Sequence, residues 1–347
     1  YRRTLTTFYM DVCPEKVDSV DQIIQKYDHK METLFVTLEP CRHTGKTPPC
    51  TQAIRRAGIE RVVIGTRDPA DHNSGRGISE LQHAGLEVQT GFLESEARQL
   101  IAPFAMLQTE RRPWVHAKWA MSLDGKLATH SGHSQWISDA DSRRHVHQLR
   151  GRMDAILVGA RTAQLDDPML TARPPGPRTP LRVVMDRLAS MPLDSQLVRT
   201  AHEIPVVVFA GHAASDSNVA RLRQSGVEVL QLDLEGSHSA SRAAMALQEL
   251  GRRNLTHVLV EGGGVVLGAF RDAGLIDEVH VFVAPKLIGG LAATTPMAGA
   301  GLASVPQSAG IELLSVQRSG QDIYLQGRVC RSAPNQQPGT DQGPAIV

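Results

Sequence analysis

The chain has 347 residues, with 37 lysines and arginines against 36 aspartates and glutamates. This balance excludes a protein that holds nucleic acid or an anionic membrane by bulk charge, and an aromatic content of 4% argues against a surface that stacks on bases. No apolar run is long enough to span a bilayer and four cysteines are too few for a disulfide framework, so we expect a cytoplasmic protein of two domains.

The first third of the chain alternates between strand-like and helix-like segments. Strands are predicted at residues 33–38, 61–65 and 86–90, and helices at residues 51–57 and 78–84. Such alternation predicts a mainly parallel sheet covered by helices on both faces.

Cys41 and Cys50 lie on either side of the first predicted loop, one after a strand and the other at a helix start. Thiols in such places have a lowered pKa, and thiolates are preferred zinc ligands. Two buried free thiols would fit the same spacing.

After Arg111-Arg112-Pro113, a plausible hinge, a second α/β pattern begins. A helix is predicted at residues 139–152, with Ser138 or Asp139 as its N-cap. Polar residues gather at the predicted strand ends, which is where open α/β sheets bind ligands. The predicted strands cover residues 114–121, 155–159, 181–186, 205–209, 257–260 and 279–285, with a late edge strand at 323–327.

The strand at residues 257–260 runs into Glu261 and three glycines, and a helical segment closed by Gly274 follows. A strand, a glycine turn and a helix start can bind a phosphate group. The spacing is not G-x-G-x-x-G, and no acidic residue follows about twenty positions on. A tight turn without a ligand explains the glycines equally well.

Other polar features favour ordinary structural roles. Asp166-Asp167 fits a helix cap or turn better than a metal pair, and Asp124-Gly125 fits a turn. Most of the 14 histidines are scattered singly and are interpreted as surface or satisfied core residues, and the basic helix around His145 and His147 as a solvated face. Residues 330–347, rich in Pro, Gln and Gly, are expected to be disordered.

Several motifs, in order, resemble one known family. LEPCxHxGxTPPC and AIRRAGIERVVIGTRDP resemble the deaminase domain of the bifunctional riboflavin-biosynthesis deaminase/reductases, and KWAMSLDGKLA, SGHSQWIS, DAILVGARTAQLDDPMLTAR, VLVEGGGVVLGAF and LIDEVHVFVAPKLIGG resemble their reductase domain. The resemblance implies an α/β protein with an incomplete cytidine-deaminase-like α/β/α domain at residues 1–110, a dihydrofolate-reductase-like domain at 111–329 and a tail at 330–347. It also implies a homo-oligomer.

The resemblance further implies NADPH-dependent reduction of 5-amino-6-(5-phosphoribosylamino)uracil, a small-molecule substrate, to the ribitylamino compound. The implied catalytic residues are Glu261 and Lys118, and Cys41 and Cys50 are the implied zinc ligands. The implied substrate positions are Ser134, Arg150, Leu170, Arg173 and Glu261, and the implied cofactor positions are Ala120, Trp136, Thr162, Asp166, Arg187, Gly263, Gly264, Gly268 and Ala269.

The deaminase half departs from the family pattern. A zinc deaminase needs a third protein ligand and a proton-shuttling carboxylate, and the family takes both from a His-Ala-Glu motif. Lys16-Val17-Asp18 stands at that position, residues 1–30 hold no His-x-Glu, and Ile101 stands where the family usually has asparagine. We expect weak zinc binding and no deamination. The alternatives are a complete bifunctional enzyme and a non-catalytic scaffold that binds the nucleotide.

Overall fold

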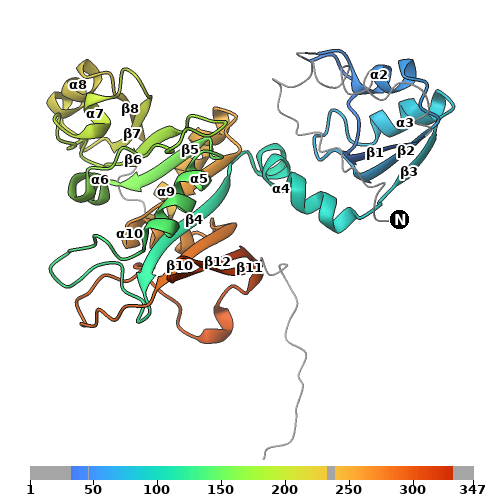
Figure 1. The fold of residues 1–347 in the computed structure, drawn as a ribbon. Coiled ribbons are helices and arrows are strands. Elements are labelled where there is room, and N and C mark those ends of the chain that lie inside the picture. Colours follow the sequence, from blue (N-terminus) through green and yellow to red (C-terminus); the bar gives the residue numbers. More distant parts are fainter. Residues whose placement is uncertain (1–32, 46, 233–238, 331–347) are drawn as a thin grey trace, which may run out of the picture. The chain divides into compact units, whose positions relative to one another are not determined.

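The computed structural model describes residues 33–45, 47–232 and 239–330. The chain divides into two compact units between Pro113 and Trp114, and Figure 1 shows the ribbon of each. The Lys16-Val17-Asp18 position and the expected disordered tail from residue 331 lie outside the described residues.

The first unit is a small parallel sheet with helices. Its strands lie in the order β1-β2-β3, and Phe35 of β1 pairs with Val63 of β2. The run of β-branched residues in β2 is buried along almost its whole length, and Val62 and Ile64 join Val36, Ile54 and Leu81 in the core. The elements are β1 (Thr33–Leu38), α2 (Cys50–Arg56), β2 (Arg61–Thr66), α3 (Arg76–His83), β3 (Glu87–Thr90) and α4 (Glu94–Glu110).

The second unit is built on a sheet of nine strands in the order β11-β12-β10-β4-β9-β5-β6-β7-β8. The seven strands from β10 to β8 run parallel, whereas β12 is antiparallel to both β10 and β11. The strands are β4 (Trp114–Ser122), β5 (Ala155–Gly159), β6 (Leu181–Met185), β7 (Val206–Gly211), β8 (Glu228–Leu232), β9 (His257–Val260), β10 (Glu278–Ala284), β11 (Ile311–Ser319) and β12 (Asp322–Val329).

Helices cover both faces of this sheet (Figure 1). Neighbouring residues of β5 separate the two faces: Ile156 packs into a core with residues of α6, α7 and α8, and Leu157 into a core with residues of α9 and α10. The helices are α5 (Ala140–Arg150), α6 (Ala160–Asp166), α7 (Gln196–Arg199), α8 (Asp216–Gln224), α9 (Ser239–Arg252) and α10 (Gly264–Asp272), with a short 3₁₀ helix η2 (Val305–Gln307).

The sequence-based expectations for the fold are confirmed in their main lines. The sheets are mainly parallel and helix-covered, and Asp139 caps α5 by accepting a hydrogen bond from the backbone N–H of Ser142 at 2.9 Å. The expected edge strand at residues 323–327 is wrong, because those residues lie in β12, which is paired on both sides, and β11 forms the edge. Among the described helices, none is long and apolar enough to cross a membrane.

Candidate active site

A buried ion pair lies where the carboxyl ends of the central strands meet. Arg150 is the last residue of α5, and Glu261 directly follows β9. The guanidinium donates from Nε and Nη2 to the two carboxylate oxygens, each at 2.7 Å, and from Nη1 to the carbonyl of Thr171 at 3.3 Å. The side chains are 14% and 7% exposed. This fork-to-fork pairing fixes the plane of both groups.

Lys118 of β4 belongs to the same charge cluster. Burial alone raises the pKa of Glu261, but the charge and hydrogen bonds of Arg150, together with Lys118, outweigh it and hold that pKa at about 2. Burial lowers the pKa of Lys118, and the nearby carboxylates of Glu261 and Asp166 oppose this shift. The site therefore pairs a fixed anion with an ammonium group that loses its proton more readily than an ordinary lysine.

Other predicted residues lie around this cluster. The hydroxyl of Ser134 donates to Oδ1 of Asp166 at 3.4 Å, which joins the loop before α5 to the end of α6. Thr162 of α6 faces the glycine turn, because a methyl group on Gly263 would lie 3.3 Å from its Oγ1. The ring of Trp136 is 63% exposed, with the guanidinium of Arg143 4.6 Å from its centre.

The glycines of α10 have a packing role that the sequence did not indicate. A side chain on Gly264 would overlap the carbonyl of Thr295, and one on Gly268 would overlap the carbonyl of Ala298. The backbone N–H of Ala298 donates to the carbonyl of Gly264 at 3.1 Å. The helix therefore lies directly against residues 295–298, and these two glycines permit that approach.

The remaining predicted site residues differ in whether their side chains are exposed or packed in the core. The side chains of Ala120 and Leu170 pack in the hydrophobic core, so either would reach a ligand through its backbone. Arg173 and Arg187 are exposed, and Arg187 is the second residue after β6. Ala269 is 7% exposed and faces the core. Their binding roles stay predictions.

Two polar features were missed from the sequence. Asp124, expected to be part of an ordinary turn, accepts hydrogen bonds from Ser122 Oγ at 2.6 Å and from the backbone N–H groups of Ile288 and Gly289 at 3.0 and 2.7 Å. These bonds lower its pKa to about 2 and tie two distant loops together. Lys286 was also missed, and its Nζ donates to the carbonyl of Trp136 at 2.7 Å.

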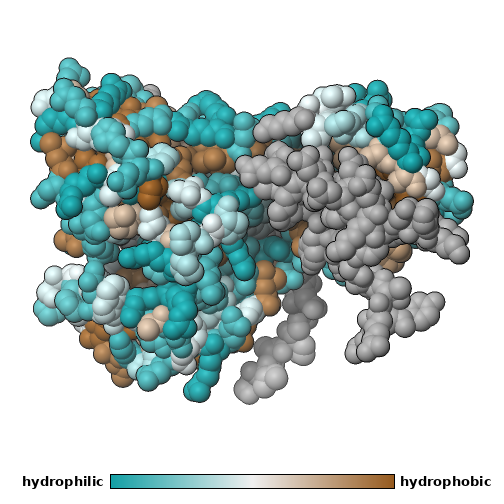
Figure 2. Space-filling model, turned by 45° about the horizontal axis from the view of Figure 1, so that its top comes forward, coloured by the Kyte–Doolittle hydropathy of each residue, from teal (hydrophilic) through white to brown (hydrophobic). Residues whose placement is uncertain are grey.

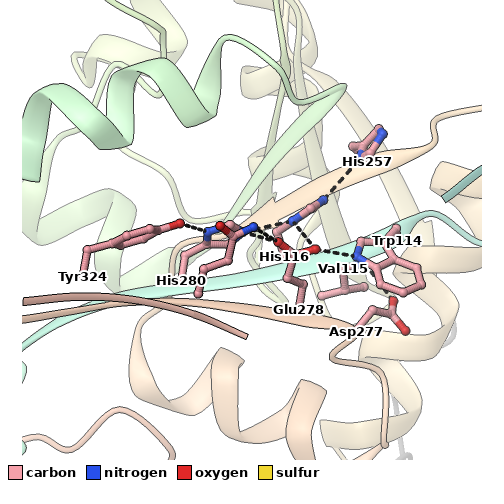
Figure 3. A network of polar contacts seen from close by, with 9 residues as sticks. Trp114, Val115, His116, His257, Asp277, Glu278, His280 and Tyr324 are labelled. Atoms are coloured by element: carbon pink, nitrogen blue, oxygen red, sulfur yellow. Dashed lines mark hydrogen bonds and ion pairs between the residues drawn. The ribbon is translucent and has the colours of Figure 1, made fainter. Parts of the chain in front are cut away.

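The interpretation of the histidines as scattered single residues is wrong for one group. His116, His257 and His280 form a hydrogen-bonded cluster with Glu278 and Tyr324 (Figure 3). The signal in the sequence was the i, i+2 spacing of His116 with Lys118 and of Glu278 with His280, which places each pair on one strand face. The pairing of β4 with β10, some 160 residues apart, was not predictable from that spacing.

In the first unit, Cys41 and Cys50 are brought together by the loop between β1 and α2. Their sulfur atoms are 3.4 Å apart and not bonded covalently. The hydrogen bond from the Cys50 thiol lowers the pKa of Cys41 to about 6, whereas donating it raises the pKa of Cys50. The pair suits two corners of a tetrahedral zinc site. Within the described part of the chain, no third histidine, cysteine or carboxylate completes a site around them.

The segment just before Cys41 is held by a buried carboxylate. Glu39 accepts backbone hydrogen bonds from Asp68, Gly75, Gly77 and Ile78 at 2.9 to 3.2 Å, and Gly77 leaves no room for a side chain beside Pro40. The position of the thiol pair is therefore set by the fold of the unit.

Comparison with known proteins gives two family matches. Residues 113–325 match the RibD C-terminal domain, and residues 16–66 match the cytidine and deoxycytidylate deaminase zinc-binding region. The riboflavin biosynthesis protein RibD of Aquifex aeolicus is 39% identical over 298 residues, which are 85% of this chain and 80% of that protein.

Two solved structures are similar over most of the chain. One is a diaminohydroxyphosphoribosylaminopyrimidine deaminase/5-amino-6-(5-phosphoribosylamino)uracil reductase from Thermotoga maritima, with 36% identity, a TM-score of 0.72, and 86% of this chain and 79% of that one covered. The other is RibD of Acinetobacter baumannii, with 32% identity, a TM-score of 0.73, and coverage of 86% and 81%.

Proposed function

The chain belongs to the RibD family of riboflavin-biosynthesis proteins, and from that premise we propose that its second unit reduces 5-amino-6-(5-phosphoribosylamino)uracil to 5-amino-6-(5-phosphoribitylamino)uracil with NADPH. The observation that carries the proposal is the buried Arg150–Glu261 pair beside Lys118, at the carboxyl edge of a parallel sheet. A buried ion pair contributes little net stability by itself, so its position at this edge favours a role in binding or catalysis.

The described residues fit the cofactor. NADPH supplies the hydride when bound. The N-terminus of α10 has no side-chain cap, so its first N–H groups are available to a phosphate. The exposed Trp136 lies on the loop before α5 and Thr162 in the first turns of α6, at the same edge of the sheet as that helix start.

Reduction of the glycosylamine adds a hydride to the sugar carbon that carries the amine, and a proton to the ring oxygen that leaves it. We assign the proton to Lys118, because its lowered pKa makes it a better acid than an ordinary ammonium group. Glu261 is ionised and accepts hydrogen bonds from sugar hydroxyls or the pyrimidine. Arg150 is committed to Glu261 and Thr171, so it holds that carboxylate in position, and the exposed Arg173 is the better phosphate ligand.

For the first unit we propose weak zinc binding without deamination. Cys41 and Cys50 supply two thiol ligands, and Lys16-Val17-Asp18 takes the position of the motif that supplies the third ligand and the proton-shuttling carboxylate in the family. Lysine is not a usual zinc ligand, and the aspartate side chain is one methylene shorter than the glutamate it replaces.

A paired measurement on one purified sample tests both halves. NADPH oxidation is followed with the phosphoribosylaminouracil substrate, and conversion of the diaminopyrimidinone phosphate is followed separately. We expect oxidation without deamination. Deamination would overturn the proposal for the first unit. NADPH binding without oxidation would favour the scaffold and overturn the reductase.

Replacing Glu261 with glutamine tests the site directly. Glu261→Gln keeps the shape of the side chain but removes the charge, and we expect the reductase rate to fall by about 100-fold, the range seen when one fixed electrostatic partner of a reacting group is lost. Glu228→Gln is the matched control, because it breaks an arginine–glutamate pair at β8, with Arg253. Equal rates in wild type and Glu261→Gln would contradict the assignment.

We further propose that the protein is a homo-oligomer, with β11 at the interface between copies. Ile311, Leu313 and Val316 are 42%, 61% and 59% exposed on this edge strand. They pair with Val329, Gly327 and Leu325 of β12, so all three lie on one face of the sheet. An apolar edge strand left open is a site of strand pairing or aggregation, and a second copy would cover it.

A further inference from the structure

Three metal-ligating side chains converge on one face of the sheet in the second unit. His116 of β4 lies opposite Glu278 of β10, and His280 follows two residues later on the same face. The side chains of His116, Glu278 and His280 are 8%, 11% and 3% exposed. Figure 3 shows them pointing toward one another from the two neighbouring strands.

The distances between their donor atoms, 3.1 to 3.8 Å, bracket those of a tetrahedral zinc site. Nδ1 of His116 is 3.1 Å from Nε2 of His280, and the carboxylate of Glu278 approaches these nitrogens to 3.8 and 3.3 Å. Ligands held at about 2.0–2.2 Å from zinc in a tetrahedron are separated by about 3.3–3.6 Å. We propose that His116, Glu278 and His280 bind a divalent zinc-class metal ion, with one coordination position left for water.

The charges in the cluster favour a cation. Within the described residues, the ion-pair partners of Glu278 are His116 and His280, with no lysine or arginine among them. Such a buried carboxylate is compensated when a cation lies beside it.

Further polar groups orient each ligand from behind. The hydroxyl of Tyr324 lies 2.7 Å from Nδ1 of His280, and Nδ1 of His257 lies 3.1 Å from Nε2 of His116. Gln326 donates to Oε1 of Glu278 at 2.7 Å. Bound metals commonly have such outer partners on the far nitrogen of each histidine, where they fix the tautomer and the ring orientation.

The competing explanation is a chain of neutral hydrogen bonds. Tyr324 can donate to His280, His280 to His116, and His116 to His257, which satisfies each group without a metal. That chain gives Glu278 no countercharge, whereas a metal ion provides one. The two explanations differ in whether the protein retains a metal after the thiol pair is removed.

The position in the sheet indicates what such a metal would do. His280 pairs in register with Lys118, so the metal would link β4 to β10 on the face that also carries the charge cluster with Glu261. The site is distinct from Cys41 and Cys50, which belong to the other unit. We therefore expect a structural site that holds the two strands together.

The test uses the full chain with Cys41→Ser and Cys50→Ser, so that the thiol pair cannot bind metal. Zinc content is measured after dialysis against zinc and then against metal-free buffer, and Co²⁺ is used as a spectroscopic probe. We expect about one retained zinc per chain, and a tetrahedral Co²⁺ spectrum without thiolate charge-transfer bands.

His116→Asn and His280→Gln keep an amide near each ligand nitrogen while removing the ligand. Each is expected to abolish zinc retention in the Cys41→Ser/Cys50→Ser background. His145→Gln is the matched control, because His145 contacts the ring of Tyr324 but contributes no atom to the ligand triangle; it is expected to retain zinc. Absence of zinc from the Cys41→Ser/Cys50→Ser parent, or retention by both ligand variants, would overturn the proposal.

Discussion

Arg150 and Glu261 form the pair on which the candidate active site depends, and their geometry makes a prediction about stability and pH. The pKa of Glu261 is lowered from 4.5 to about 2 in the folded chain. A carboxyl group whose pKa is lowered by folding stabilises the protein at pH values above its unfolded-state pKa. This stabilisation is lost as the pH falls through the folded-state pKa. As an order of magnitude, this pKa shift corresponds to a pH-dependent contribution of about 3 kcal/mol to the unfolding free energy.

We therefore expect the difference in unfolding free energy between wild type and Glu261→Gln to be constant above about pH 5 and to shrink as the pH falls from 4.5 toward 2. Urea unfolding at several pH values measures this difference. Glu228→Gln, at a more exposed pair, is expected to change stability by about 0–1 kcal/mol. If the difference in unfolding free energy between wild type and Glu261→Gln stayed unchanged down to pH 3, it would contradict the lowered pKa of Glu261.

The sequence allowed only part of the site to be predicted at the level of residues. Motif order gave Ser134, Asp166 and Glu261 as site positions, and the structure places Ser134 against Asp166 and Glu261 against Arg150. It could not show that Arg150 is committed to a carboxylate, or that the Leu170 side chain packs in the core. Those facts depend on the direction in which each side chain points, which motif spacing does not determine.

The glycines of helix α10, predicted to bind a phosphate group, also allow the helix to pack closely against residues 295–298. At an ordinary exposed helix position, replacing glycine with alanine stabilises by about 0.5–1 kcal/mol. At Gly268 the added methyl group would overlap the carbonyl oxygen of Ala298, so we expect Gly268→Ala to destabilise the protein by about 1–3 kcal/mol. Denaturant unfolding measures whether Gly268→Ala is less or more stable than the wild type. The control is Val265→Ala, at a position 72% exposed on the same helix, and we expect it to have little effect. Stabilisation by Gly268→Ala would show that α10 does not lie so close to residues 295–298.

The elements that were predicted are those with a strong local pattern. Buried β-branched runs gave β2, β5, β6 and β7, and an N-cap gave the start of α5. The strand β11 was not predicted, because apolar and polar residues do not alternate regularly along its sequence. In the structure its apolar residues are exposed. Its pairing with β12 includes a bulge between Leu313 and Ser315, and such irregularity breaks the two-residue period.

At the scale of the whole molecule, the features hidden from sequence are those made by distant segments. The histidine cluster needs β4, β9, β10 and β12 to lie side by side, and Asp124 bonds to residues more than 160 positions away. Figure 2 shows a face on which polar side chains predominate and apolar ones lie in smaller groups between them. Strand order is a property of the completed fold.

Assembly is the remaining property at this scale. Interior strands of the sheet are paired on both edges, whereas β11 has one free edge and exposes Ile311, Leu313 and Val316 on one face. A second copy that pairs along β11 would satisfy the free backbone groups and bury these side chains. We expect light scattering after size exclusion to show an oligomer for the wild type and a smaller species for Leu313→Lys/Val316→Lys. The control Leu193→Lys, 41% exposed away from β11, should behave as wild type. A monomeric wild type would contradict the assembly, and an unchanged oligomer in the double variant would contradict the assignment of the interface to β11.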